Sequence, residues 1–210
     1  MLEIQNWGLI DCTAAWNRQK ELVADIQQKR DRNVLVLCQH PSVITIGRNG
    51  TMGNITADRK FLEQIGISVY DVDRGGDVTL HNPGQIVGYP IINLSAYKED
   101  LHWFLREVEE CIIVTLKDFG IESGRVHGLT GVWVDGKRKI CAMGFHCSRW
   151  VTSHGFALNV NNDLREFGFI VPCGITDKEV TSISAELGTQ IDINVIESKL
   201  TEVFQKSFTI

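Results

Sequence analysis

One of the six cysteines in this chain stands in a turn that could present a reactive thiol. Cys173 lies between Pro172 and Gly174, so a rigid residue and a permissive one flank it. Loops of this kind often carry reactive groups. A thiol becomes a nucleophile at neutral pH when a nearby cation or helix N-terminus lowers its pKa from about 8.5. The alternative is a small buried hydrophobic residue, which is the commoner role of a lone cysteine.

Lys139 is a candidate for the activating cation. It begins the apolar segment KICAMG, and strand alternation predicts that its side chain shares a face with Cys141 and Met143. A lysine on a covered face needs a reason, and stabilisation of a thiolate would be one. The alternative is that its aliphatic part is buried while its ammonium group reaches solvent at the end of the strand.

The Gly-rich segment RGGDVTLHNPGQ at 74–85 is typical of a loop that a ligand can approach closely. Gly75 and Gly76 permit positive φ and leave backbone amides open to a ligand. The segment contains neither GxGxxG nor Gly-Lys-Ser/Thr, which excludes a dinucleotide or phosphate loop of the usual kind. The alternative is a plain hairpin turn with a surface arginine. Thiol, cation and Gly-rich loop together suggest acyl transfer through a cysteine nucleophile.

His154, between Ser153 and Gly155, is either a satisfied histidine at a loop-to-strand junction or a group that contacts substrate. The histidines and cysteines do not form a metal-binding pattern, because no pair has the close spacing of a zinc site. Even His146 and Cys147 would point to opposite faces of a strand. We therefore expect neither a metal nor a bound cofactor.

The totals are those of an ordinary globular protein. With 210 residues, 43% hydrophobic and 22% charged, the chain can bury a sizeable core in one domain. A net charge of −5 argues against a general nucleic-acid binder. The N-terminus lacks a secretory signal pattern, and no stretch of eighteen apolar residues predicts a membrane span. Six cysteines without a CxxC pair favour free thiols in a reducing compartment, so we expect a cytoplasmic protein.

Helices with recognisable ends should position these residues. The patterns predict helices over 12–32 with Asp11 as N-cap, over 57–65, over 101–119 before Gly120, and from Asn194 to Phe208. Asn194 and Glu197 are spaced like an N-cap and its N3 partner.

Strands account for most of the rest. The patterns predict strands over 34–39, 42–47, 67–73, 85–94, 131–134, 139–147 and 154–160. Asp135-Gly136 predicts a hairpin between two of them. The strands come in runs between single helices, which favours a single α+β domain over residues 1–210, built on a mixed β-sheet with packed helices.

Taken together, these motifs resemble the lipoyl(octanoyl) transferase family. The likeness runs from about Asp11 to about Leu187 and includes HPSVITIGRNG, DRGGDVTLHNPGQIVGYPIINL, LHWFL, DFGI, TGVWV, KICAMG, TSHGFALNV, IVPCGI and VTSISAELG. The resemblance implies a fold shared with the catalytic domains of lipoate– and biotin–protein ligases. It also implies transfer of an octanoyl (or lipoyl) group through a cysteine acyl-thioester, as the first step of endogenous protein lipoylation, without a cofactor.

The resemblance also implies partners. The donor would be octanoyl-acyl carrier protein. The acceptors would be the lipoyl domains of 2-oxoacid dehydrogenase E2 subunits and the glycine cleavage H protein. Nucleic acid and membranes would not be partners. Because the protein partners are typically acidic, we expect a basic rim around the site with Arg74 and Arg48 or Arg149.

The site residues follow from the resemblance position by position. Cys173 would be the nucleophile and Lys139 the activating lysine. The segments that bind the acyl group would be Arg74, Gly75, Gly76, Asp77, Val78, Thr79, Leu80 and His81, then Ala142, Met143 and Gly144, and finally Gly155, Phe156 and Ala157. Two positions depart from the family pattern: Asn82 replaces the usual glycine, and Leu80 replaces a frequent tyrosine.

Three other activities compete with this interpretation. An ATP-dependent lipoate–protein ligase would use the same fold without a cysteine thioester. A binding module without activity would hold carrier or lipoyl domains and form no acyl adduct. A thiol protease would need a Cys–His–Asn arrangement that the sequence does not suggest.

Overall fold

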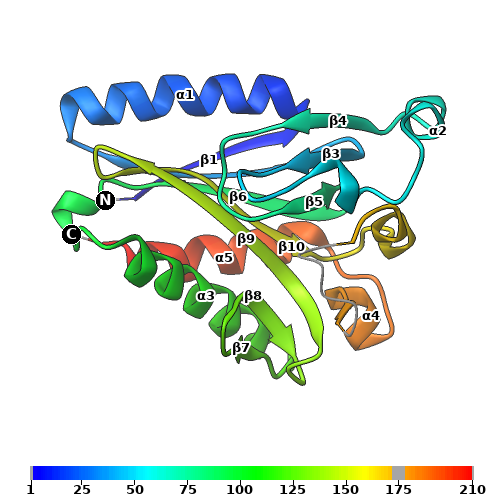
Figure 1. Ribbon diagram of the computed structural model, residues 1–210. Helices are drawn as coiled ribbons and strands as arrows, with labels where there is room; N and C mark the ends of the chain where they lie inside the picture. Colours follow the sequence, from blue (N-terminus) through cyan, green and yellow to red (C-terminus); the bar gives the residue numbers. More distant parts are fainter. Residues whose placement is uncertain (1, 172–177, 210) are drawn as a thin grey trace.

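The main β-sheet of the protein has helices on both faces (Figure 1). The structure is a computed structural model that describes residues 2–171 and 178–209. Helix α1 (Cys12–Lys29) covers one face, and α3 (Leu101–Asp118) and α5 (Ile193–Ser207) cover the other. A mixed sheet with packed helices is the α+β class that the sequence predicts.

Eight strands form the main sheet. Their order is β1-β2-β6-β10-β9-β8-β7, and β11 pairs with β9 beside this path. The β1–β2 and β11–β9 pairs are parallel, whereas the other pairs are antiparallel. The bounds are β1 (Leu2–Leu9), β2 (Asn33–Gln39), β6 (Gln85–Ile91), β7 (Gly124–Val126), β8 (Leu129–Val134), β9 (Arg138–Ser148), β10 (Val151–Asn159) and β11 (Glu179–Val180).

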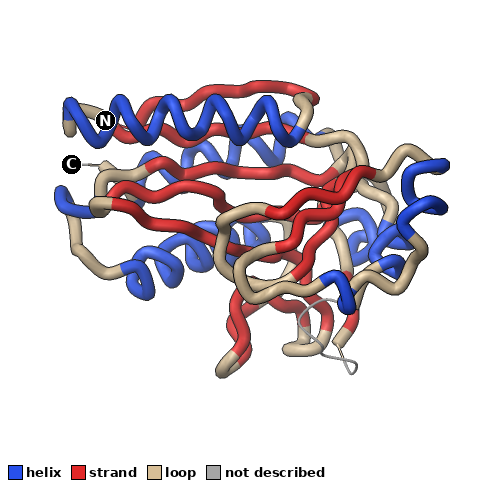
Figure 2. The backbone as a smooth tube through the Cα atoms, turned by 45° about the horizontal axis from the view of Figure 1, so that its top comes forward, coloured by secondary structure: helices blue, strands red, loops and turns tan. Residues whose placement is uncertain are grey.

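A second, three-stranded sheet stands beside the main one and can be followed in Figure 2. Its order is β4 (Ser68–Asp71), β3 (Val43–Ile46), β5 (Val78–His81), and α2 (Arg59–Gln64) packs against it. The sequence analysis expects one sheet. The chain passes between the two sheets in the β2–β3 and β5–β6 connections, which contain Pro41 and Pro83, and proline cannot donate to a strand ladder.

Local signals set several boundaries as predicted. The Asp11 carboxylate accepts hydrogen bonds from the amides of Thr13 and Ala14 and so caps α1. That helix ends earlier than predicted, because Arg30 adopts the left-handed conformation at φ 58°. Asp135 and Gly136 have φ of 51° and 66°, as a tight hairpin between β8 and β9 requires.

The predicted cap of α5 is wrong. Asp192, two residues before Asn194, accepts from the Asn194 amide and is the N-cap. Glu197 does not close a capping box, because its carboxylate accepts from the Asn6 side chain on β1 instead.

The sequence analysis also misses β1. This strand pairs with β2 at one edge of the main sheet and is half exposed along most of its length, so it lacks a clear apolar alternation. By contrast, all of β6 is buried, as in a strand that is covered on both faces. The remaining elements are α4 (Ile183–Leu187) and the 3₁₀ turns Met52–Asn54, Leu94–Ala96 and Leu164–Phe169. No helix within the described ranges is long and apolar enough to cross a membrane.

Candidate active site

Two adjoining cavities lie where the Gly-rich loop crosses β9 and β10. The first opens between α1 and the main sheet, and the second lies between the loop, α3 and the β7–β8 hairpin. They share Arg74, Thr79, Ala142, Met143 and Gly144. The other residues of the first cavity are Cys12, Trp16, Gln19, Thr45, Val72, His81, Val87, Tyr89, His154, Gly155, Phe156 and Ala157.

The floor of the first cavity is made of small residues on two neighbouring strands. Gly144 of β9 pairs with Gly155 of β10, and Ala142 pairs with Ala157. A Cβ atom on Gly144 would lie 2.4 Å from the carbonyl oxygen of Gly75, so this position has to be glycine for the loop to rest on the strand. The two segments that the family resemblance implies are therefore brought together across one strand pair. The absence of large side chains there leaves room for a ligand.

Arg74 holds the Gly-rich loop and does not lie on a basic rim, so that expectation is wrong. Its side chain is buried, and its guanidinium donates to the carbonyl and hydroxyl oxygens of Thr45 at 2.8 and 3.0 Å. It also donates to the Gly75 carbonyl at 3.0 Å. The expectation that Arg149 lies on the rim is also wrong, because Arg149 lies in the β9–β10 turn and contacts Gln27 there. That turn is at the opposite end of β9 from Lys139. Arg48 is exposed beside the loop.

The backbone of the Gly-rich loop makes a hydrogen bond to β9 that the sequence does not predict. The Gly75 amide donates to the Phe145 carbonyl at 3.0 Å, so it is engaged with β9 and is not open to a ligand as expected. Gly76 has φ of 86° and Asp77 lines the second cavity with Val78. These contacts fix the loop to β9. Thr79, which follows on β5, lines both cavities.

Leu80 and Asn82, the two departures from the family pattern, lie away from both cavities. Leu80 packs fully buried in the apolar core of the small sheet, so its side chain does not line the site. Strand alternation explains this, because Thr79 and His81 then face the first cavity. Asn82 donates to the Asp163 carbonyl and to Glu166.

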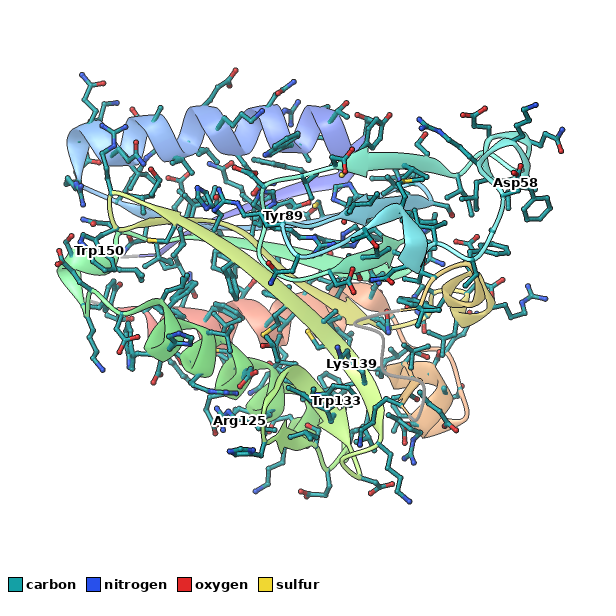
Figure 3. All side chains as sticks on the ribbon, viewed as in Figure 1. Asp58, Tyr89, Arg125, Trp133, Lys139 and Trp150 are labelled. Atoms are coloured by element: carbon teal, nitrogen blue, oxygen red, sulfur yellow. The ribbon has the colours of Figure 1, made fainter. Side chains whose placement is uncertain are left out.

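A β-bulge turns Lys139 toward the cavities. Trp133 of β8 pairs with Lys139 and Val132 pairs with Cys141, so Ile140 is the extra residue. Ile140 and Cys141 are both buried in the core against α3 and α5. Lys139 therefore faces the opposite side, and the prediction that it shares a face with Cys141 is wrong. The bulge places Lys139 in the wall of the second cavity. Figure 3 shows Lys139 next to Trp133.

The predicted nucleophile, Cys173, lies outside the described residues together with its turn. The described chain continues at Lys178, and Val180 of β11 pairs directly with Lys139. The one described cysteine in the wall of the first cavity is Cys12. Burial raises the pKa of the Cys12 thiol to about 11, so it stays protonated and unreactive at neutral pH.

His154 ties the loop to β10. Its Nε2 lies 2.6 Å from a carboxylate oxygen of Asp73, and its amide donates to the Gln19 side chain. The residue has φ of 57°, a conformation that few non-glycine residues adopt. Burial lowers the pKa of His154 in spite of the carboxylate. His154 is therefore a satisfied histidine, but it lies within β10 and not at a loop-to-strand junction. It also lines the first cavity, and its contact with substrate stays a prediction.

A buried network of hydrogen bonds, which the sequence analysis misses, connects the Gly-rich loop with β9 at Lys139. His81 Nδ1 lies 2.8 Å from Gln85 Oε1, and the Gln85 amide donates to Asn159. Asn159 donates to the Thr181 carbonyl, and the Thr181 amide donates to the Lys139 carbonyl. The signal that could have found it is polar Gln85 at the start of a fully buried strand.

His81 is the titratable residue at one end of this hydrogen-bond network. Burial lowers the pKa of His81 to about 3, so the imidazole is neutral at physiological pH. Because an amide oxygen accepts from Nδ1, the proton sits on Nδ1 and Nε2 remains an acceptor. Within the described ranges, no cluster of three His, Cys, Asp or Glu side chains could hold a metal ion.

The fold and this site define a known class. Residues 11–205 match the model of the lipoyl protein ligase A/B catalytic domain. A bi-partite lipoate protein ligase from Thermoplasma acidophilum superposes with a TM-score of 0.73 at 16% identity, covering 99% of this chain and 84% of the other. A biotin protein ligase from Aquifex aeolicus superposes with a TM-score of 0.51 at 11% identity, covering 98% and 68%. These two structures show the shared fold.

Closer relatives identify the branch. The octanoyltransferase of Solibacter usitatus is 49% identical over 98% of this chain and 92% of its own length. The octanoyltransferase of Cytophaga hutchinsonii is 44% identical over 94% of this chain and 88% of its own. The chain belongs to the lipoyl(octanoyl) transferase family, and it is an acyltransferase.

Proposed function

We propose that this chain, as one catalytic domain over residues 1–210, transfers an octanoyl (or lipoyl) group from acyl carrier protein to a specific lysine of lipoyl domains. The acceptors are the lipoyl domains of 2-oxoacid dehydrogenase E2 subunits and the glycine cleavage H protein. The observation that carries the proposal is the Gly144–Gly155 and Ala142–Ala157 floor beside a lysine that a bulge turns to the same face.

The acyl chain enters the first cavity and lies over this floor. The apolar residues of its wall include Trp16, Val72 and Val87. Each buried methylene contributes about 0.8 kcal/mol, so the depth of the cavity sets the preferred chain length. The thioester carbonyl then lies near Ala142 and Gly144, where the two cavities meet. The second cavity leaves space for the pantetheine arm and later for the acceptor lysine.

The first half-reaction moves the acyl group to Cys173. The Lys139 ammonium stabilises the Cys173 thiolate, which attacks the thioester carbonyl. The new carbon–sulfur bond forms and the bond to the pantetheine sulfur breaks, and the Lys139 ammonium gives that sulfur its proton, so pantetheine leaves as a thiol and Lys139 becomes neutral. The pairing of Val180 with Lys139 supports a position of Cys173 near this lysine, because Val180 is only seven residues after Cys173.

The second half-reaction forms an amide. The deprotonated amine of the acceptor lysine attacks the acyl-enzyme carbonyl, and the Cys173 sulfur leaves as a thiolate. The amine proton passes to the neutral Lys139, which restores its ammonium beside the Cys173 thiolate. A thioester is converted into a more stable amide, so the reaction needs no ATP.

The proposal is tested by mixing the protein with octanoyl-carrier protein and a lipoyl domain in a buffer without ATP. Intact-mass spectrometry should show the lipoyl domain gaining one octanoyl group on its target lysine. A lipoyl domain with that lysine changed to arginine is the control and should gain nothing. Transfer that starts only when ATP and free fatty acid are added would instead make the protein a ligase.

A further inference from the structure

Trp133 lies directly against the ammonium group of Lys139. The two residues are cross-strand partners on β8 and β9, and Lys139 Nζ lies 4.6 Å from the centroid of the indole ring (Figure 3). Trp133 is 2% exposed, and Lys139 is partly buried. A cation at this distance from a tryptophan face is attracted by the ring's quadrupole, and tryptophan gives the strongest such contact among the aromatic residues.

We propose that Trp133 is a positioning residue that holds the Lys139 ammonium in the wall of the second cavity. The inference rests on the proposed function, because it assigns the orientation of the lysine that stabilises the thiolate there. A lysine side chain has a flexible four-carbon stem, so its charged end needs a partner to stay in one place. The indole is one such partner, and it lies on the neighbouring strand at the position that the bulge aligns with Lys139.

The surroundings of Trp133 fit this role better than a place in the apolar core. Val132 and Val134 on either side pack against α3 and α5, whereas Trp133 lies on the opposite face with Lys139. Its indole Nε1 is buried and has no hydrogen-bond partner among the residues that the structure describes. The polar contacts that the structure describes for the Trp133 side chain are therefore made by the face of its ring.

A second lysine approaches the same ring and must be separated from the first. Lys178 Nζ lies 6.0 Å from the ring centroid, farther than Lys139, and donates to the Gly136 carbonyl at 3.0 Å. That hydrogen bond fixes Lys178 to the hairpin turn. We therefore expect Trp133 to hold the Lys139 ammonium in place independently of Lys178.

The test is NMR of the full chain with ¹³C at the lysine Cε positions, which reports the contact without any transfer reaction. In the native protein the Lys139 methylene protons, assigned with Lys139→Arg, should be shifted upfield by the ring current. Trp133→Leu should abolish this shift and Trp133→Phe should keep part of it. Lys178→Gln should leave it in place. Trp7→Leu is the matched control, since Trp7 carries Arg18 over its ring at the other edge of the sheet.

Kinetics then connect the contact to the reaction. Trp133→Leu should lower kcat about tenfold with little change in KM for the octanoyl donor, and Trp133→Phe should recover most of the rate. Absence of a ring-current shift at Lys139, or an equal loss in Trp7→Leu, would overturn the inference. So would a Trp133→Phe variant that melts like the native protein yet is as slow as Trp133→Leu. Failure of the proposed function is seen separately, as a native protein with the NMR signature but no octanoyl transfer.

Discussion

Replacing Lys139 with alanine should slow octanoyl transfer at pH 7 by about 10²- to 10⁴-fold, the range typical of a lost catalytic proton donor or acceptor. The ammonium group lies in the wall of the second cavity, where the described chain returns beside it at Val180. Without it, the Cys173 thiolate forms only near the ordinary thiol pKa of about 8.5. The deficit should therefore shrink as the pH is raised toward 9. The measurement is kcat/KM for the octanoyl donor as a function of pH.

The neighbouring Lys137→Ala variant is the matched control for charge removal, because Lys137 is exposed on the hairpin turn. It should transfer at the native rate. If Lys139→Ala retains native kcat/KM while its melting temperature falls, Lys139 is a structural residue and the assignment is wrong. An equal loss in both variants would point to a general effect of charge on docking of the acidic partners.

Replacing Ala142 with leucine should slow transfer of an eight-carbon chain far more than transfer of a short one. Ala142 lies on the small-residue floor opposite Ala157 and lines both cavities. A leucine there would exclude about four methylenes, which removes about 3 kcal/mol of burial and lowers kcat/KM for the octanoyl donor about 10²-fold. A short donor such as the butyryl thioester should be affected much less. The measurement is kcat/KM across a series of acyl chain lengths.

Ala142→Gly is the control in this series, because it leaves the floor open, and it should keep the order of preference among chain lengths. Equal losses for short and long donors in Ala142→Leu would show that the substitution disturbs the reacting carbonyl or the loop. The acyl chain would then have to lie elsewhere than over β9 and β10.

Features governed by local chemistry could be predicted from the sequence. The Asp11 carboxylate caps α1 because its acceptor oxygen reaches the first free amides, and Asp135-Gly136 makes a tight turn because both residues tolerate positive φ. The family resemblance also implies that Ala142 and Ala157 belong to segments that bind the acyl group. The structure brings them together as cross-strand partners.

Features that depend on pairing between distant strands could not be predicted. The side chain of Lys139 faces the cavities because Ile140 is an extra residue opposite β8, and alternation read along one strand cannot detect a bulge. Arg74 is buried because Thr45, on the central strand β3 of the small sheet, offers it two oxygen acceptors. The link from Gln85 to Asn159 likewise joins β6 to β10 across many residues of sequence.

The central claim is that an octanoyl group rests on Cys173 between donor and acceptor. The most direct measurement is peptide mass spectrometry of the native protein after brief reaction with octanoyl-carrier protein alone, followed by addition of the lipoyl domain. The octanoyl group should appear on the peptide containing Cys173, leave it when the acceptor is added, and be absent in Cys173→Ala. Transfer at the native rate by Cys173→Ala, or an adduct that the lipoyl domain does not discharge, would contradict the account.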